Sequence, residues 1–526
     1  MSLNAAVGLA LAGLVLIVAA NLLSHRIGAP ASALLVIAGL LYGLLPGPNV
    51  HLDPHIILVL VLPPLLYSAA LNSSLIAIRA SIRPVISLSV LLVIATALAV
   101  GGAVSAILPE LPLAAAVALG AAAAPPDPVA ALSVGRRARL PVRLITLIEG
   151  EGLLNDATAL TTYQVAVATA IGNKLAWAPV GSRFFFAAVG GTAIGLAVAW
   201  LLHLPRRALD DPLLENAISL MTPFAAYLAA EGAHTSGVLA VVVAGLWMGH
   251  RAPVVVSGAT RLQTRAVWRL TDFLLEGFVF LLIGQQLPDV IRGLKVYSAH
   301  QVIWASLASV LIVLAIRPLW LLVTSHLPGR FGLGTALSIP EVAAMSFAGT
   351  RGVISLATIF ALPLTTRAGV PFPDRDLLIF CVYCVVLVTL VGQGLAFGPL
   401  LRILGLQEDP YTQRRERSEA RVAAAEAAIR FLDDLPDDQR PSDDVLRRLR
   451  RVADDRCRRA KAHLARAQSD DPETDDPIAE AGHLRRLMIE AQRDELVRWR
   501  DAGRLPDRGL RALERELDHE EGMLPP

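Results

Sequence analysis

Charged residues, aromatic side chains and cysteines are all scarce in this chain of 526 residues. Only 17% of the residues are charged and the formal net charge is +2, so no broad basic surface is expected for nucleic acid. Three cysteines do not make a disulfide framework. The spacing of Cys381 and Cys384 puts both on one helix face, which favours packing over a redox or metal site. Because the phosphate loop G-x-x-x-x-G-K-[ST] and the zinc motif H-E-x-x-H are both missing, we expect no cofactor.

Hydrophobic residues make up 54% of the chain, more than in an ordinary soluble domain. They are concentrated in the first part, whereas the remainder is charged and rich in alanine, as in "QRRERSEARVAAAEAAIRFLDD". This contrast predicts a transmembrane domain over residues 1–405 and a charged, helical, cytoplasmic tail over residues 406–526.

The apolar runs predict an all-α polytopic membrane protein with about thirteen transmembrane helices, each needing about 20 residues to span the bilayer. The first run lacks a basic leader and is too long for a signal peptide, so we interpret it as a membrane helix. With the tail in the cytoplasm, most loop arginines fall on the cytoplasmic side, including those of "GRRARLPVR". This asymmetry is what the positive-inside rule expects.

Two of the predicted spans are interrupted. In the fifth, the prolines of "GAAAAPPDPVAAL" remove backbone donors, and Asp127 lies inside the break. In the twelfth, Gly349 and Gly352 permit unwinding within "SFAGTRGVISLA". The breaks lie seven spans apart, so each falls on the fifth helix of one of two six-helix halves in opposite orientation. This pattern predicts inverted repeats with crossed broken helices and a transport site near the midplane of the bilayer.

The sixth span carries three acids within "LIEGEGLLNDA". Glu149 and Asp156 share a helix face, and Glu151 and Asn155 stack along a neighbouring one. A buried carboxylate needs a cation or a proton as its partner, so an acid inside a membrane is a candidate functional group. Asp156 is the deepest of the three and is the candidate for binding either a hard cation or a proton. Gly152, one turn earlier, is expected to leave a gap beside it.

Arginines are within reach of the other two acids. Glu151 is the natural partner of Arg351, because both need neutralisation inside the membrane. Glu149 lies roughly 9 Å along a helix from Arg143, so it either reaches the cytoplasmic interface or tunes access to the site. Further charged residues are expected toward span ends without a role in transport: Glu215, Glu231, Glu276, Arg317 and Glu341.

Three motifs together resemble the sodium/proton exchangers of the monovalent cation:proton antiporter family, of the bacterial NhaP-like type. The sixth-helix pattern of that family, Glu-Gly-Glu-Ser-Leu-Leu-Asn-Asp, is met by "EGEGLLND". Its fifth-helix Asp-Pro element is met by "DPVA", and its twelfth-helix Arg-Gly motif by "RGVISLA". The similarity covers most of the chain.

The resemblance implies a role for each matching residue. Asp156 is implied to exchange cation for proton, and Asn155 to complete an Asn-Asp pair that is linked in this family to electroneutral exchange. Asp127 is implied to balance the ends of the crossed broken helices. Glu151 and Arg351 are implied to form a structural ion pair across the site. A homodimer in the cell membrane is also implied.

This chain departs from the family pattern close to the site. Gly152 stands where many members have a serine, Ser68 where some have a glutamate, and Pro126 where a threonine is common. We therefore expect Asp156 to bind the cation together with water and a small set of other oxygens: Ser68 and the backbone carbonyls of Pro125 and Pro126.

These observations predict a secondary transporter, not an enzyme, that exchanges a monovalent cation for H⁺ with Asp156 as the shared site. Na⁺ is the expected cation, with Li⁺ and K⁺ left open, so a potassium/proton antiporter is the nearest alternative. A cation channel with a regulatory tail is another alternative, but no repeated filter-like carbonyl loop occurs. An intramembrane aspartyl protease built on Asp127 and Asp156 would be expected in a Gly-x-Gly-Asp context, which the sequence lacks.

Overall fold

Helices dominate the computed structural model, and the residues that it describes form no strand beyond one bridging pair. The described residues are 3–27, 30–45, 57–172, 177–206, 211–326, 337–406, 410–436, 440–468, 477–502 and 504–522. The chain divides into two compact units, residues 1–408 and 409–526. The all-helical class predicted from the sequence is confirmed.

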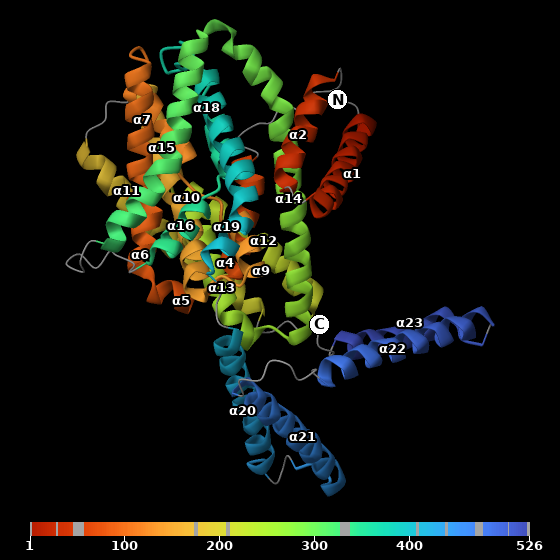
Figure 1. Ribbon diagram of the computed structural model, residues 1–526. Coiled ribbons are helices and arrows are strands. Elements are labelled where there is room, and N and C mark those ends of the chain that lie inside the picture. Colours follow the sequence, from red (N-terminus) through yellow and green to blue (C-terminus); the bar gives the residue numbers. More distant parts are fainter. Residues whose placement is uncertain are drawn as a thin grey trace. The chain divides into compact units, whose positions relative to one another are not determined.

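The first unit holds the long apolar helices (Figure 1). Its elements in chain order are α1 (Leu3–Ile27), α2 (Ala31–Leu44), η1 (Ile57–Val61), α4 (Leu62–Leu71), α5 (Leu75–Ala80), α6 (Ile82–Ile86), η2 (Ser87–Leu91), α7 (Leu92–Ile107), α8 (Leu113–Ala123), α9 (Pro128–Arg137), α10 (Val142–Ala170), α11 (Trp177–Arg206), α12 (Pro212–Gly232), α13 (Gly237–Val255), α14 (Gly258–Gly293), η3 (Leu294–Val296), α15 (Ala299–His326), α16 (Ile339–Phe347), α17 (Val353–Phe360), α18 (Arg375–Leu387), η4 (Val388–Gln393) and α19 (Gly394–Leu404).

The described residues of the second unit form two helix pairs. Their members are α20 (Pro410–Asp433) with α21 (Asp443–Gln468), and α22 (Pro477–Asp501) with α23 (Asp507–Gly522). Charged contacts join the helices of each pair: Lys461 Nζ lies 2.9 Å from Glu426 Oε1, and Arg485 Nη2 lies 2.9 Å from Glu520 Oε1. That this unit lies in the cytoplasm stays a prediction.

Several helices of the first unit are long and apolar enough to cross a membrane. Within the described residues there are seven candidates: Val7–Ser24, Ile82–Ile107, Phe185–Arg206, Pro212–Gly232, Gly237–Val255, Ala299–Ser325 and Arg375–Leu404. Shorter apolar helices cover Ala31–Leu44, Val59–Leu71 and Leu113–Ala123. Together they make the chain a multi-pass membrane protein. The count of thirteen spans and the inverted repeat stay predictions.

Both interruptions predicted from the sequence are present. The chain leaves the helix between Ala123, the last residue of α8, and Pro128, the first of α9. It leaves the helix again between Phe347, which ends α16, and Val353, which begins α17. The C-terminal part of α8 is entirely buried, and its run of alanines lets α7, α10, α17 and α18 approach closely.

Helix α14 packs along α2 through glycines (Figure 1). A Cβ atom on Gly284 would lie 2.1 Å from the backbone oxygen of Val36, and one on Gly39 would lie 2.0 Å from the backbone oxygen of Leu281. Small residues at such an interface let two membrane helices approach backbone to backbone. The contact therefore fixes the position of α14, which carries part of the cavity described below.

Substituting Gly284 by alanine should destabilise the protein, because the added methyl group meets backbone that has no room to move. Overpacking of this kind costs about 1–3 kcal/mol. Thermal unfolding of the purified protein in detergent measures the effect. The matched control is Gly102→Ala on α7, where a Cβ meets nothing within 4 Å. Equal unfolding temperatures for the two variants would contradict the packing described here.

Candidate functional site

The two interrupted helices meet at their breaks. The Asp127 N–H donates a hydrogen bond to the Thr350 carbonyl at 2.6 Å, and Thr350 Oγ1 donates to the Asp127 carbonyl at 3.1 Å. Asp127 Oδ1 also accepts from the Val129 N–H at 3.0 Å, so its side chain caps the start of α9. A Cβ on Gly352 would lie 1.8 Å from Asp127 Oδ2, so only glycine allows this approach.

Arg351 binds the carbonyl ends of both interrupted helices. Its Nε donates to the Ala123 carbonyl at the end of α8, and its Nη1 donates to the Gly349 carbonyl beyond the end of α16, each at 2.8 Å. Its backbone N–H donates to Thr389 Oγ1 at 3.0 Å. A cation at helix C-termini offsets the partial negative charge of the free carbonyls. Arg351 therefore stabilises the break itself.

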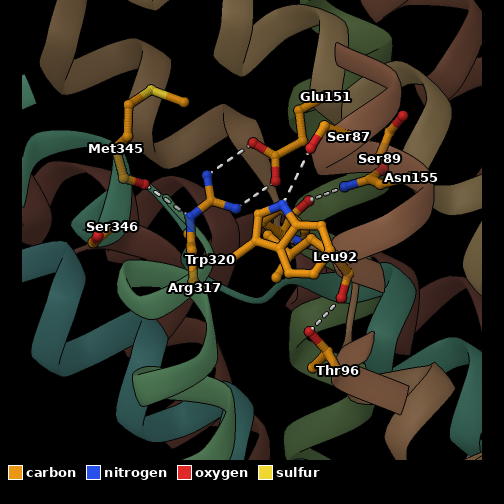
Figure 2. Close-up of polar contacts among 12 residues, drawn as sticks. Ser87, Ser89, Leu92, Thr96, Glu151, Asn155, Arg317, Trp320, Met345 and Ser346 are labelled. Carbon is orange, nitrogen blue, oxygen red and sulfur yellow. Dashed lines mark hydrogen bonds and ion pairs between the residues drawn. The ribbon is translucent and has the colours of Figure 1, made fainter. Parts of the chain in front are cut away.

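Glu151 forms its ion pair with Arg317 of α15. The two Nη atoms of Arg317 donate to the two carboxylate oxygens, and Arg317 Nε donates to the Met345 carbonyl at 2.8 Å (Figure 2). Both side chains are buried. The predicted pairing of Glu151 with Arg351 is therefore wrong, because carbonyl groups occupy Arg351 while α15 brings Arg317 to the acid. The expectation that Arg317 lies toward a span end without such a role is wrong as well.

Asn155 and Asp156 lie on α10 beside the first break. Asn155 Nδ2 donates to the Pro126 carbonyl at 3.0 Å, which anchors α10 to the break. Asn155 Oδ1 is enclosed and accepts no hydrogen bond from the residues that the structure describes. Asp156 is only 5% exposed, and its carboxylate has no hydrogen bond or ion pair within the described part of the chain. Asp156 therefore keeps its oxygens available for a cation or a proton.

A cavity of about 380 Å³ lies beside Asp156. It brings together most of the candidate residues from the sequence: Ser68, Pro125, Pro126, Asp127, Glu149, Gly152 and Asp156. Asp272 and Glu276 of α14 line it too. Glu276, which is expected toward a span end, thus lies in the cavity wall, and the motifs in the sequence do not single out Asp272. The sequence does contain a pattern that could have identified the two acids. Asp272 and Glu276 are four residues apart within the apolar stretch "TDFLLEGFVF", and this spacing puts both on one helix face.

Glu149 and Gly152, the other two candidates on α10 in the cavity wall, both contact residues of α9. Glu149 Oε1 lies 2.6 Å from Nη2 of Arg136, a residue of α9 with a 59% exposed side chain, so this acid of the cavity wall has a solvated partner. A Cβ on Gly152 would lie 2.5 Å from Cγ of Pro128. The Pro128 ring of α9 therefore occupies the space that a side chain at position 152 would need, while Gly152 itself lines the cavity beside Asp156.

Apolar helices of spanning length, two interrupted helices joined at their breaks and a cavity lined by carboxylates define a multi-pass membrane transporter. The sequence pattern of the family described as "sodium/hydrogen exchanger, transmembrane" matches residues 12–403. The chain therefore belongs to the sodium/hydrogen exchanger family, as the motif resemblance predicts.

Known proteins of this family are similar over most of the chain. An uncharacterized Na⁺/H⁺ exchanger of Mycobacterium tuberculosis is 35% identical over 523 residues, 97% of this chain and 94% of the relative. A sodium, potassium, lithium and rubidium/H⁺ antiporter of Bacillus pumilus is 31% identical over 72% of this chain and 59% of the relative. The structure of the sodium proton antiporter MjNhaP1 of Methanocaldococcus jannaschii matches with a TM-score of 0.60 at 19% identity, over 77% of this chain and 100% of that one. This last likeness shows the fold.

Replacing Arg317 by methionine should destabilise the protein by about 3–5 kcal/mol, because Glu151 is left buried without its cation. The double variant Arg317→Met/Glu151→Leu removes both charges and should recover most of the loss. Thermal unfolding in detergent measures both. Arg136→Met, which breaks the more exposed pair with Glu149, should cost less than about 1 kcal/mol. If Arg317→Met were no worse than this control, the structural role of the buried pair would be contradicted.

Substituting Gly152 by serine should lower the unfolding temperature, since the new side chain pushes Pro128 and α9 away from α10. Gly102→Ser, at an open position on α7, serves as the control and should leave the unfolding temperature close to that of the native protein. A Gly152→Ser protein as stable as the control would contradict the close packing of Pro128 against Gly152.

Proposed function

We propose that this protein exchanges a monovalent cation, with Na⁺ preferred, for a proton across the membrane, and that Asp156 is the residue both ions share. The observation that carries the proposal is the Asp156 carboxylate in the cavity wall, buried and without a protein partner among the described residues. Membership of the sodium/hydrogen exchanger family supports the same function.

The exchange follows from the physics of a buried carboxylate. A charge in a medium of low dielectric constant is costly unless a cation or a proton neutralises it. Asp156 therefore binds one of the two at a time, and the arrival of one displaces the other. Movement of one helix bundle against the other would expose the cavity to each side in turn. If one cation crosses for each proton, no net charge moves and the exchange is electroneutral.

The surrounding groups complete the cation site in this proposal. Ser68 and the Pro125 carbonyl supply neutral oxygens from the cavity wall. The Pro126 carbonyl accepts from Asn155 with one of its two lone pairs, and the other remains for the cation. Oxygen donors of this kind suit a hard monovalent cation, with water filling the remaining positions.

The proposal also covers the transported cation, the membrane in which the protein lies and its oligomeric state. Relatives are named for Na⁺ alone and for Na⁺, K⁺, Li⁺ and Rb⁺ together, so Na⁺ is proposed first and K⁺ is the alternative. We place the protein in the cell membrane as a homodimer with the charged tail in the cytoplasm. A cation channel is the less favoured alternative, and its conduction would need no proton.

Asp156→Asn should abolish exchange, with less than about a tenth of the native rate remaining, because an amide neither takes up a proton nor neutralises a cation. The measurement is proton movement driven by a Na⁺ gradient in proteoliposomes that contain a pH-sensitive dye. Asp289→Asn is the control: Asp289 lies on α14 with a 49% exposed side chain paired to Arg292.

The result that overturns the assignment is cation-coupled proton movement that survives in a folded Asp156→Asn protein. A current that follows an applied voltage without any proton movement would instead favour the channel. Thermal unfolding of each variant shows whether it is folded.

A further inference from the structure

Asp272 of α14 is a carboxylate of the cavity that the exchange mechanism above does not use. Its Oδ2 accepts a hydrogen bond from Ser68 Oγ at 2.6 Å. Its Oδ1 is enclosed and accepts no hydrogen bond in the part of the chain that the structure describes. A buried carboxylate oxygen without a donor is costly unless a cation or a proton binds there. The unpartnered oxygen therefore points to a ligand.

Neighbouring charges do not satisfy Asp272. Glu276, one turn further along α14, and Asp127 line the same cavity as Asp272, and all three are acids. Arg269, one turn before Asp272, donates from Nε to the Arg265 carbonyl and forms no ion pair with Asp272 within the described residues. Like charges that share a low-dielectric cavity repel each other, and a mobile cation relieves that repulsion.

Ser68 holds the Asp272 carboxylate in one direction. The serine lies on α4 and is only 2% exposed, so its hydroxyl has little freedom to leave the contact. The distance of 2.6 Å is typical of a hydroxyl that donates to an ionised carboxylate. The contact joins α4 to α14 across the cavity wall, and the packing of Gly284 on α2 holds α14 further along its length. The hydrogen bond from Ser68 therefore fixes the orientation of the Asp272 carboxylate in the cavity wall.

We propose that Asp272, oriented by Ser68, is a second cation-binding carboxylate of the cavity and determines the preference among Na⁺, Li⁺ and K⁺. The inference rests on the proposed exchange function. Asp156 couples the cation to the proton, whereas Asp272 contributes affinity and selectivity. Two carboxylates form a ligand set of higher field strength than one carboxylate with neutral oxygens, and field strength is a means of discriminating small cations from large ones.

The first test separates affinity from turnover. Asp272→Asn should raise the KM for Na⁺ about tenfold, which corresponds to a loss of about 1.4 kcal/mol, while the maximal rate changes by less than about twofold. The KM for Li⁺ should rise as well and that for K⁺ should rise less, so selectivity moves toward K⁺. Asp289→Asn, on the same helix but outside the cavity, should leave all three KM values unchanged.

The second test moves the carboxylate across the contact. Ser68→Asp/Asp272→Ser exchanges the two side chains and keeps both the hydrogen bond and the negative charge. The double variant should bring the KM for Na⁺ back toward the native value, whereas Asp272→Ser alone should keep it raised. This comparison also covers the case in which Asp272→Asn fails to fold.

Each outcome has a definite consequence. If native protein exchanges ions but removal of the Asp272 carboxylate leaves the KM values for the three cations unchanged, the inference is overturned and the exchange function stands. The inference is overturned equally if the swapped protein keeps the raised KM of Asp272→Ser. If the native protein itself exchanges no cation for protons, it is the proposed function that fails.

Discussion

An interrupted helix inside a bilayer must find partners for the backbone groups that its break leaves unpaired. In this protein the residues at the two breaks form hydrogen bonds with each other. Asp127 and Thr350 exchange two hydrogen bonds, and Arg351 takes carbonyl groups at the ends of two helices. Asn155 takes the Pro126 carbonyl and so ties α10 to the same point. The position of the cavity, and of Asp127 and Asp156 in its wall, depends on this junction.

The charged groups near the junction differ in how far protein partners satisfy them. Glu151 and Arg317 neutralise each other and fasten α10 to α15, so neither is free to bind an ion. Asp156 has no protein partner in the described residues and faces the cavity. Asp272 is intermediate, because one oxygen is held by Ser68 and the other is not. A carboxylate without a fixed counter-charge is the one that a mobile cation can neutralise.

Local chemistry explains why part of this site is predictable from the sequence. Prolines and glycines inside apolar runs predict the two interruptions, and an acid deep in such a run predicts Asp156. The partner of Glu151 is not predictable in this way, because Arg317 and Arg351 both lie far along the chain from it. Only the packing of the helices determines that Arg317, and not Arg351, pairs with Glu151. The filled space at Gly152 depends likewise on the approach of another helix.

The central claim is that cation and proton compete for one carboxylate, and proton release on cation binding tests it most directly. Na⁺ is added to the purified protein in a weakly buffered solution, and the protons released are counted against the cations bound. Competition at Asp156 predicts about one proton released for each cation bound at a pH at which Asp156 is fully protonated before Na⁺ is added, and about half a proton where it is half protonated. It also predicts no release from Asp156→Asn. Saturable Na⁺ binding to the native protein without proton release, over the pH range in which the protein exchanges ions, would contradict the account.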